Sequence, residues 1–403
     1  MHSEPIPGSS ASHPPFRAVL PWLFFITASF FLNFVARTIF SPLLVPLEHD
    51  LHINHAQAGR FFLDMSLGYG ISLLLSGFLS CRVSHRVIIA LTPLCMGATL
   101  FGMAACHSLL PFELLLVAFG LSIGIYLPSG VAAVVSLVSP KNVGKAIAIH
   151  ELAPNLSYIM GPLLAELFLR FTSWRGALVW LGAISMAFSL VFLRFGRGGN
   201  FLADKPSFSL AREFVSQPMF WIMLFLFAIA IGASFGPYSV MPLFLVNERG
   251  YDSSLANQLL ALSRLLGPLV VFATGWLTDT IGPKPTMALF TVLAGFATLL
   301  LGVLHGGWLV AAILLQPPLT VLFFSAGFTA ISRIYPKKMG SLAVAFIIPA
   351  GIVLGNGLVP AALGYMGKNH TFAQGFILVG ILTLIGFPCL RFLSVPPAGD
   401  DRE

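Results

Sequence analysis

Charged side chains are scarce in this chain of 403 residues, where Asp, Glu, Lys and Arg together make up 9%. Soluble domains carry about 25% charged residues, so the composition excludes an ordinary soluble domain. Hydrophobic residues account for 57% of the chain, and 38 glycines and 28 prolines accompany them. Gly and Pro are more frequent in membrane helices than in soluble ones. The composition therefore indicates a polytopic membrane protein with little mass outside the bilayer.

Cysteine is also rare, and the four thiols show no metal-ligand spacing. They are Cys81, Cys95, Cys106 and Cys389, and we expect them to pack as small hydrophobic side chains. The chain contains no GxxxxGKS loop of the kind that powers an ATP-driven pump. No pairing of a nucleophile with a base stands out either. We therefore predict that the protein is not an enzyme and uses neither a cofactor nor a metal.

Long hydrophobic runs make up most of the sequence. A transmembrane helix needs about 20 mostly apolar residues, and twelve stretches meet that length. We predict an all-α membrane protein whose spans are residues 18–45, 56–80, 87–107, 111–138, 144–169, 175–194, 218–246, 255–278, 285–304, 308–333, 339–366 and 372–393. Residues 1–16 are polar and rich in Pro and Ser, which favours disorder. The first apolar run is too long for a cleavable signal peptide.

The distribution of positive charge predicts the orientation. Outside the predicted spans and at their ends, fifteen Lys and Arg side chains fall on one side of the membrane and five on the other. The positive-inside rule then places both termini in the cytoplasm. The net charge of +7 is accordingly an orientation signal, and we expect no nucleic-acid partner. The short loops favour a cell (inner or plasma) membrane, in which we expect a monomer in contact with the lipid bilayer.

The chain divides into two halves of six spans. The longest polar connection, residues 195–214, separates a predicted bundle 17–194 from a second bundle 215–394, and a tail of 395–403 follows. The halves echo each other, since Pro42 and Pro242 end corresponding spans and are 200 residues apart. A second pair of matching segments, "GFLSCRVSHR" and "GWLTDTIGPK", is offset by 198 residues. Internal duplication of this kind builds many secondary transporters.

The segment "GWLTDTIGPK" resembles the loop signature of the major facilitator superfamily. The resemblance rests on Gly275, Leu277, Asp279, Gly282 and Lys284, together with the layout of six plus six spans and the charge bias. It covers essentially all twelve spans. It implies two pseudo-symmetric six-helix bundles that rock around a central site and expose it to each side in turn.

The copy of this signature in the first half is degenerate. Cys81 stands where the family has its Asp, and Ser84 stands where it has the second Gly. In the family this Asp helps to hold the cytoplasmic side closed, and a thiol cannot supply the hydrogen bond of a carboxylate. We expect the cytoplasmic gate to depend more on Asp279, although both loops alternatively serve only to set topology. The predicted gating residues are Gly77, Arg82, Arg86, Gly275, Asp279, Gly282 and Lys284.

Two arginines fall inside predicted spans. By a rise of 1.5 Å per residue, Arg37 and Arg264 each lie about 22 Å from the cytoplasmic interface. Such charges face an aqueous cavity or a partner because a lone charge in lipid is costly. A guanidinium fork binds carboxylate or phosphate and stays charged, which predicts an anion site shared by the halves. The alternative is internal pairing of the arginines with Asp64 or Glu151.

Acidic and amide groups complete the predicted site. A carboxyl group away from water holds its proton near neutral pH, so we predict that Glu151, with His150 as a helper, couples transport to protons. Asp64 is the second proton candidate, although Arg60 one helical turn away favours a simple ion pair. Further polar groups near mid-span can orient a bound anion or merely bridge helices. They are Asn33, Tyr126, Tyr238 and Asn356.

These observations predict a secondary active transporter of a small organic anion of carboxylate type, coupled to protons and working by alternating access. Two alternatives remain open. One is efflux of amphiphilic drugs by proton antiport, for which the 37 phenylalanines would supply a broad apolar cavity. The other is exchange of inorganic anions or organophosphates. The sequence does not distinguish import from export.

Overall fold

The structure is a computed structural model in which every regular element is a helix. Twelve helical stretches within the described residues are long and apolar enough to cross a membrane, and each coincides with one predicted run. This confirms the predicted fold class. The described residues are 14–204, 211–335, 337–369 and 371–396.

Three of the segments predicted to lie outside the bundles are described only in part. Residues 1–13 of the N-terminal segment, 205–210 of the connection and 397–403 of the tail lie outside the described residues. The described end of the connection forms a short helix, α10 (Ala211–Ser216), instead of continuing as a loop.

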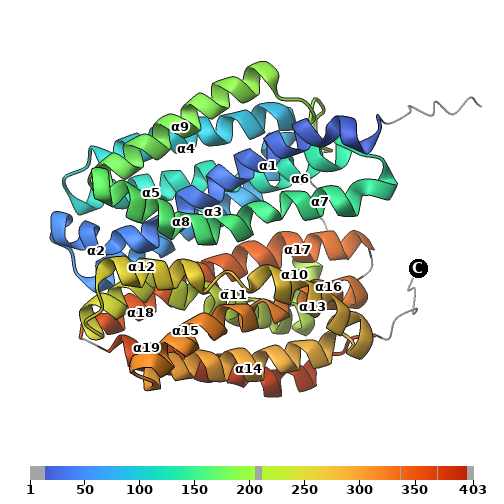
Figure 1. Cartoon of the computed structure of the whole chain (residues 1–403). Coiled ribbons are helices and arrows are strands. Elements are labelled where there is room, and N and C mark those ends of the chain that lie inside the picture. Colours follow the sequence, from blue (N-terminus) through green and yellow to red (C-terminus); the bar gives the residue numbers. More distant parts are fainter. Residues whose placement is uncertain (1–13, 205–210, 336, 370, 397–403) are drawn as a thin grey trace, which may run out of the picture.

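The first half of the chain forms one bundle, drawn in blue to green in the upper part of Figure 1. Its elements are α1 (Phe16–Thr38), α2 (Phe40–Leu51), α3 (His55–Ser80), α4 (His85–Ala104), α5 (Leu109–Gly124), α6 (Tyr126–Leu137), η1 (Pro140–Asn142), α7 (Val143–His150), α8 (Leu152–Phe171) and α9 (Trp174–Phe195). The second half forms the lower bundle. Its elements after α10 are α11 (Pro218–Leu243), η2 (Phe244–Glu248), α12 (Ser253–Leu262), α13 (Gly267–Ile281), α14 (Pro283–Val303), α15 (Gly306–Thr320), α16 (Leu322–Ile334), α17 (Lys337–Ile352), η3 (Val353–Leu358), α18 (Val359–Gly367), α19 (Phe372–Cys389) and η4 (Leu390–Phe392).

The two bundles repeat the same packing scheme. The third span packs along the sixth in the first half, as α4 on α9, and the ninth packs along the twelfth in the second half, as α14 on α19. Between the bundles the second span contacts the eleventh, as α3 on η3 and α18, while the fifth contacts the eighth, as α8 on α12. The second span corresponds to the eighth by the duplication, and the fifth corresponds to the eleventh. The two contacts between the bundles are therefore equivalent. The predicted internal duplication is therefore visible in three dimensions.

Seven of the predicted spans are not single α-helices. Spans one, four, five, eight and ten each break into two helices, while the seventh ends in a π-helical turn and the eleventh contains one. Discontinuous helices and π-turns recur at transport and other functional sites because they free backbone groups and redirect side chains. The sequence predicted continuous spans because the hydrophobic runs continue across these breaks and π-turns.

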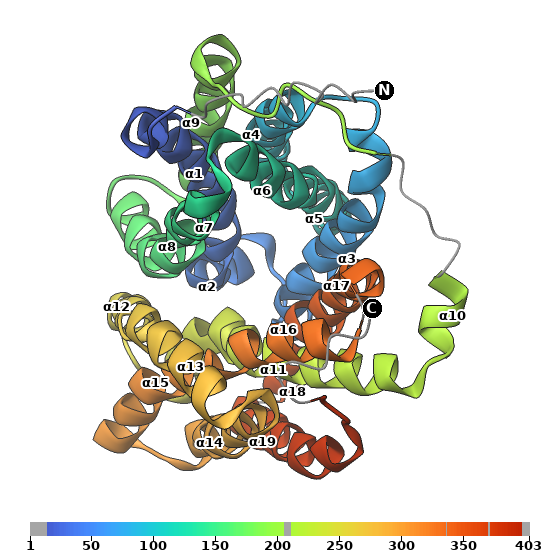
Figure 2. The same ribbon diagram turned by 90° about the vertical axis from the view of Figure 1, so that its right-hand side faces the viewer.

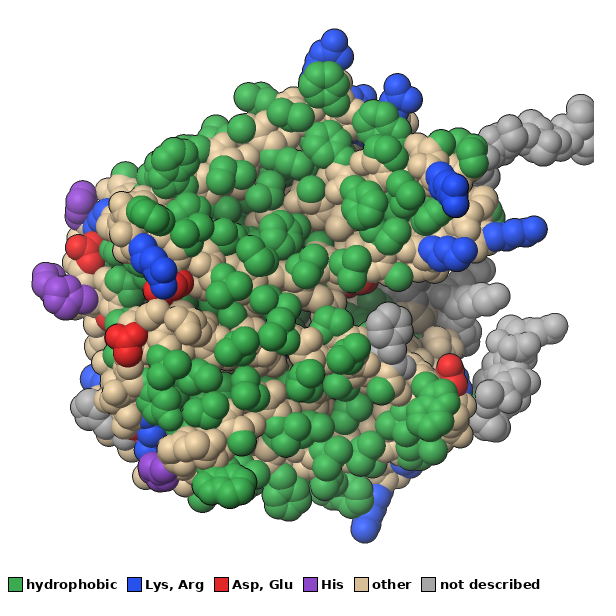
Figure 3. Space-filling view, in the orientation of Figure 1, with side chains coloured by type: hydrophobic (Ala, Val, Ile, Leu, Met, Phe, Trp, Pro, Cys, Tyr) green, Lys and Arg blue, Asp and Glu red, His purple; other side chains and the backbone are tan. Residues whose placement is uncertain are grey.

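The surface fits a lipid environment. Large apolar side chains are exposed all along the bundles, and Figure 3 shows them covering the middle of the molecule while charged groups gather at its two ends. The first and last described residues lie at the same end, at the right of Figure 1. We call this end the termini face, and the other end the opposite face. Figure 2 looks onto the termini face and shows the two bundles side by side.

Candidate functional site

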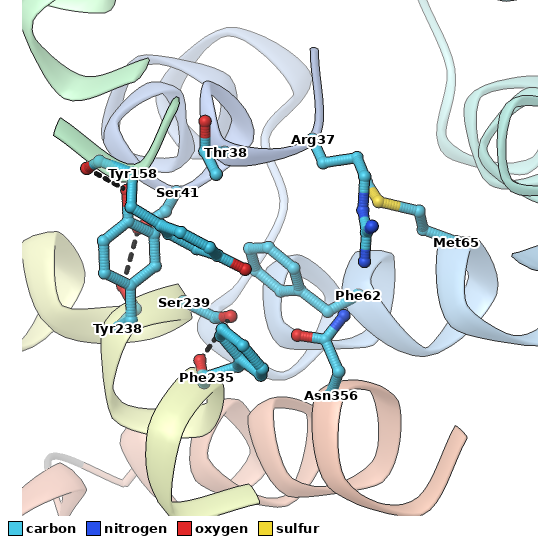
Figure 4. A pocket seen from close by; sticks show the side chains of 10 residues that line it. All are labelled: Arg37, Thr38, Ser41, Phe62, Met65, Tyr158, Phe235, Tyr238, Ser239 and Asn356. Carbon is cyan, nitrogen blue, oxygen red and sulfur yellow. Dashed lines mark hydrogen bonds between the residues drawn. The ribbon is translucent and has the colours of Figure 1, made fainter. Parts of the chain in front are cut away.

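A small pocket of about 20 Å³ lies between the two bundles, with ten side chains around it (Figure 4). Both halves of the chain contribute to its walls. The lining residues are Arg37, Thr38, Ser41, Phe62, Met65 and Tyr158 from the first half, and Phe235, Tyr238, Ser239 and Asn356 from the second.

Arg37 brings the single formal charge among these ten side chains. It lies in the last turn of α1, and its guanidinium carbon is 4.6 Å from the centre of the Phe34 ring and 4.5 Å from that of Tyr69. Among the described residues it forms no ion pair, so the predicted alternative of pairing with Asp64 or Glu151 is not observed. Figure 4 shows the guanidinium pointing across the pocket toward the amide of Asn356. The charge is therefore held by ring faces and left available to a ligand.

Arg264 occupies a neighbouring pocket, at the break between α12 and α13. Its side chain is buried, with the guanidinium carbon 4.8 Å from the ring centre of Tyr158 and 4.6 Å from that of Tyr238. One terminal nitrogen donates a hydrogen bond of 2.7 Å to the carbonyl of Ser234. Its Nε has no hydrogen-bond partner among the described residues. Aromatic rings stabilise both arginines by cation–π attraction instead of carboxylates.

Tyr158 connects the two arginine pockets, because its side chain lines both of them. Its ring stacks on Phe235 at 5.3 Å, and its backbone carbonyl accepts a hydrogen bond from the hydroxyl of Tyr238. In Figure 4 its own hydroxyl points into the middle of the first pocket. Sequence analysis missed this residue. A signal was present, since Tyr158 lies seven residues after Glu151 and so on the same side of a helix.

Polar groups at the second-half wall contact the first bundle. Asn356 lies in the π-turn η3, and its amide nitrogen is 3.3 Å from the hydroxyl of Ser66 in α3. The carbonyl of Tyr238 accepts a hydrogen bond of 2.8 Å from Ser41 of α2. Both contacts join one bundle to the other. The structure thus brings two of the predicted polar candidates, Tyr238 and Asn356, to the pocket with Arg37.

Two other candidates, Asn33 and Tyr126, lie outside both arginine pockets. Asn33 is buried and donates its amide to the carbonyl of Ile123, tying α1 to α5. Tyr126 is fully buried, and its hydroxyl donates to the carbonyl of Ile26. Each side chain forms its hydrogen bond inside the first bundle, because a buried polar group without a partner lowers the stability of the fold.

The predicted proton-coupling pair sits at the junction of α7 and α8. Glu151 is the single residue between these helices, and half of its side-chain surface is exposed. The expectation that it is withdrawn from water is therefore wrong for this conformation. Its carboxylate lies within electrostatic reach of the Tyr69 phenol, which also contacts Arg37. His150, by contrast, is fully buried, as expected for adjacent helical residues that point about 100° apart.

Asp64 has the ion pair that the sequence predicted and a second acidic neighbour that it did not. Its Oδ1 lies 3.8 Å from Nε of Arg60, which is also 3.5 Å from Oε1 of Glu113 on α5. Both carboxyl groups are buried, and each has an oxygen without a hydrogen-bond partner among the described residues. The group lies within the first bundle and outside the arginine pockets. Glu113 was missed because its sequence context showed no pairing partner.

The seam between the bundles is closed toward the opposite face. On one side of the seam, α3 and α18 touch through their backbones, since a Cβ added to Gly59 would lie 2.6 Å from the carbonyl oxygen of Pro360. On the other side, the carboxylate of Glu166 in α8 accepts hydrogen bonds from Ser254 (2.7 Å) and Asn257 (3.5 Å) of α12. These contacts block access to the pocket from that end.

The bundles touch less extensively toward the termini face. Near that face, α6 and α7 in the first half and α13 and α16 in the second make no substantial contact across the seam within the described part of the chain, whereas α3 and α17 do touch, since a Cβ added to Gly70 would lie 3.4 Å from the carbonyl oxygen of Pro349. Figure 3 shows the molecule notched between its halves at this end. The seam is thus less tightly closed toward the face that bears the termini than toward the opposite face.

The predicted gating loops lie at the termini face. In the first half, Arg86 donates to the carbonyl of Leu193, and in the second, Lys284 donates to the carbonyl of Leu393. Gly282 ends α13 with a φ of 89°, a conformation that favours glycine. Asp279 is exposed and pairs with no described side chain. The remaining gating residues are Gly77, Arg82 and Gly275, which lie in the same two segments.

Comparison with solved structures agrees with this architecture. A bacterial homologue of the human lysosomal transporter Spinster, in an inward-facing and unoccupied conformation, superposes with a TM-score of 0.81 at 16% identity, covering 96% of this chain and 100% of that one. A peptide transporter of the POT family gives a TM-score of 0.78 at 13% identity, over 94% and 96% of the two chains. A nucleoside transporter gives 0.78 at 13% identity, over 92% and 99%. At these identities the likeness concerns the fold alone.

Sequence comparison gives the family. An uncharacterised MFS-type transporter of Mycobacterium tuberculosis is 26% identical over 289 residues, which are 68% of this chain and 62% of the relative. The chain therefore matches somewhat less than two thirds of that protein's length. The profile of the Major Facilitator Superfamily matches residues 26–316 and 267–403. With twelve spans among its described residues, in two duplicated bundles around a central pocket, the chain belongs to the Major Facilitator Superfamily.

Proposed function

We propose that this transporter carries a small organic anion of carboxylate type, coupled to protons, by alternating access. The observation that carries the proposal is the unpaired guanidinium of Arg37 in a pocket whose other nine lining side chains are uncharged. A carboxylate would find there the charge of Arg37, the amide of Asn356 and the hydroxyls of Tyr158 and Ser239. Charge-assisted hydrogen bonds of this type are about twice as strong as neutral ones.

The walls of the pocket favour an anion with an apolar body. Four of its ten lining residues are aromatic, and rings of this kind bind flat or aliphatic groups through their faces. Because the same chain supplies both halves of the pocket, the proposed transporter works as a monomer.

Charge balance supplies a reason for alternating access. The empty pocket region holds the positive charges of Arg37 and Arg264, which repel each other if the bundles close around them. An anion offsets that repulsion and favours closure. In this scheme Glu151 binds the coupling proton, since half of its side-chain surface is exposed and its charge acts on the Tyr69 phenol that also contacts Arg37.

A ligand screen on the purified protein tests the anion site. We would follow the melting temperature with benzoate, lactate, succinate, glycerol 3-phosphate, sulfate and the lipophilic cation tetraphenylphosphonium, because a ligand of the folded state raises it. Benzoate or lactate should stabilise the wild type, and Arg37→Gln should abolish that shift. Arg197→Gln is the matched control, since Arg197 also lies over an aromatic ring (Trp22, 4.7 Å) but at the surface.

The same screen separates the alternatives. Stabilisation by tetraphenylphosphonium alone would favour efflux of amphiphilic cations and overturn the anion site. Stabilisation by sulfate or glycerol 3-phosphate alone would favour exchange of inorganic anions or organophosphates. A benzoate shift that persists in Arg37→Gln would mean that Arg37 does not bind the anion.

A further inference from the structure

His150 is a buried histidine with one used and one unused nitrogen. Its side chain is fully buried, and its imidazole stacks on the ring of Phe30 at 4.3 Å. The ring of Tyr126 lies parallel to it at 6.0 Å. Its Nε2 is 3.1 Å from the hydroxyl of Tyr126, whereas its Nδ1 has no hydrogen-bond partner among the described residues.

The hydrogen bonds around Tyr126 determine which nitrogen carries the proton. The Tyr126 hydroxyl has one hydrogen, and it lies 2.8 Å from the carbonyl oxygen of Ile26, which can only accept. That hydrogen is therefore used, and the hydroxyl oxygen must accept from His150. Consequently Nε2 bears the hydrogen and Nδ1 bears a free lone pair.

The free lone pair faces the exposed carboxylate. Nδ1 lies 3.7 Å from Oε1 of Glu151, close enough for electrostatic interaction but longer than a hydrogen bond. A lone pair and an ionised carboxylate oxygen repel each other, which explains why the two atoms do not close to bonding distance. A single added proton would turn this repulsion into a charge-assisted hydrogen bond.

We propose that Nδ1 of His150 is the atom that receives the coupling proton from Glu151, and that loading draws the Glu151 carboxylate onto His150. The inference rests on the proposed function, whose proton-coupling step it specifies. The rings of Phe30 and Tyr126 can stabilise the buried imidazolium through their faces. Loading leaves Glu151 as a carboxylate but takes the net charge of the Glu151–His150 pair from −1 to 0, so the region around Arg37 becomes more attractive to an anion. Proton and anion would then load together, as symport requires.

The neighbours of His150 leave few other proton donors. Of the described groups that face the imidazole, α1 presents the Phe30 ring, α6 presents the Tyr126 phenol, and the α7–α8 junction presents Glu151. The Tyr126 phenol is already engaged by its two hydrogen bonds. Glu151 is therefore the ionisable group placed between the solvent and Nδ1.

Nitrogen-15 NMR of histidine-labelled protein in lipid vesicles tests the proposal without any substrate. The chain has 10 histidines, so the His150 signals are assigned by their loss in His150→Gln, in which the amide can still donate to Tyr126. At alkaline pH we expect a hydrogen on Nε2 alone, and on acidification a second hydrogen on Nδ1. In Glu151→Gln the doubly protonated signal should be lost, because the carboxylate that stabilises it is gone.

A second buried histidine, His85, provides the matched control for this measurement. His85 is also buried, but its partner is the hydroxyl of Ser129 at 3.1 Å, so His85→Gln should leave the titrating signal unchanged. A hydrogen on Nδ1 at alkaline pH, or a signal that titrates equally in Glu151→Gln, would overturn the proposal. The measurement contains no anion, so a transporter that binds none of the screened anions refutes the proposed function without affecting this result.

Discussion

Gly59 should control the balance between the two orientations of the transporter. It lies where α3 crosses α18, and a Cβ added there would be 2.6 Å from the carbonyl oxygen of Pro360 and 2.9 Å from Cα of Gly364. Both contacts are with backbone, so no side chain can move aside. Gly59→Ala should therefore force the bundles apart at the opposite face and destabilise the conformation that is closed there.

The expected size of this effect follows from the crowding. Overpacking a close contact costs about 1–3 kcal/mol, which corresponds to a shift of about 5- to 150-fold in the ratio of two conformations. Alanine also favours the helical state by about 1 kcal/mol over glycine. That gain applies equally to both orientations, since α3 is helical in each, and it cancels from their ratio.

Distances between spin labels measure the shift. One label would replace His49 in the first half and the other Lys368 in the second, both exposed at the opposite face, after the native cysteines are replaced. Gly59→Ala should lengthen the dominant distance. The control is Gly120→Ala, which would also meet backbone, at the Met65 carbonyl, but inside one bundle. It should lower the melting temperature without changing the distances. An unchanged distance distribution in Gly59→Ala would refute the reasoning.

Three further predictions concern the pocket and its charges. Arg37→Lys keeps the charge but loses the planar fork, so anion affinity measured by calorimetry should fall between those of the wild type and Arg37→Gln; affinity equal to the wild type would argue against fork binding. Tyr158→Phe removes the hydroxyl that points into the pocket and keeps the ring over Arg264, so affinity should fall by about 0.5–1.5 kcal/mol at an unchanged melting temperature. Asp64→Asn should leave uptake driven by a pH gradient intact, whereas Glu151→Gln should abolish it; the reverse pattern would transfer the proton site to Asp64.

The sequence predicted the fold well because hydrophobic length, charge bias and duplication are properties of the chain itself. It also predicted that Arg37 and Arg264 approach the centre, since a charge inside a span has few other places to go. It could not predict their surroundings. The arginines are covered by rings from other spans, and the contacts of Arg264 with Tyr158 depend on how α8 meets α12 across the seam.

The candidates that lie outside the arginine pockets share a physical reason. Asn33 and Tyr126 lie near mid-span, as expected, but depth along a helix does not tell which side of it a residue faces. Both face neighbouring helices of their own bundle, where each finds a backbone carbonyl. Glu151 was expected to be shielded from water because it lies about 10 Å into the fifth span. The break after His150 instead leaves the carboxylate exposed.

The tighter closure of the seam toward the opposite face has a consequence for inhibitors. A blocker of the Arg37 pocket must arrive from the termini face while the transporter rests in this conformation, because the contacts of Gly59 and Glu166 close the other entrance. Added to the opposite side of a sealed vesicle, a membrane-impermeant blocker would act only on transporters that had already turned over. The fraction of blocked transporters would then grow as they complete transport cycles. The rate of block in such a preparation would therefore measure the rate of turnover.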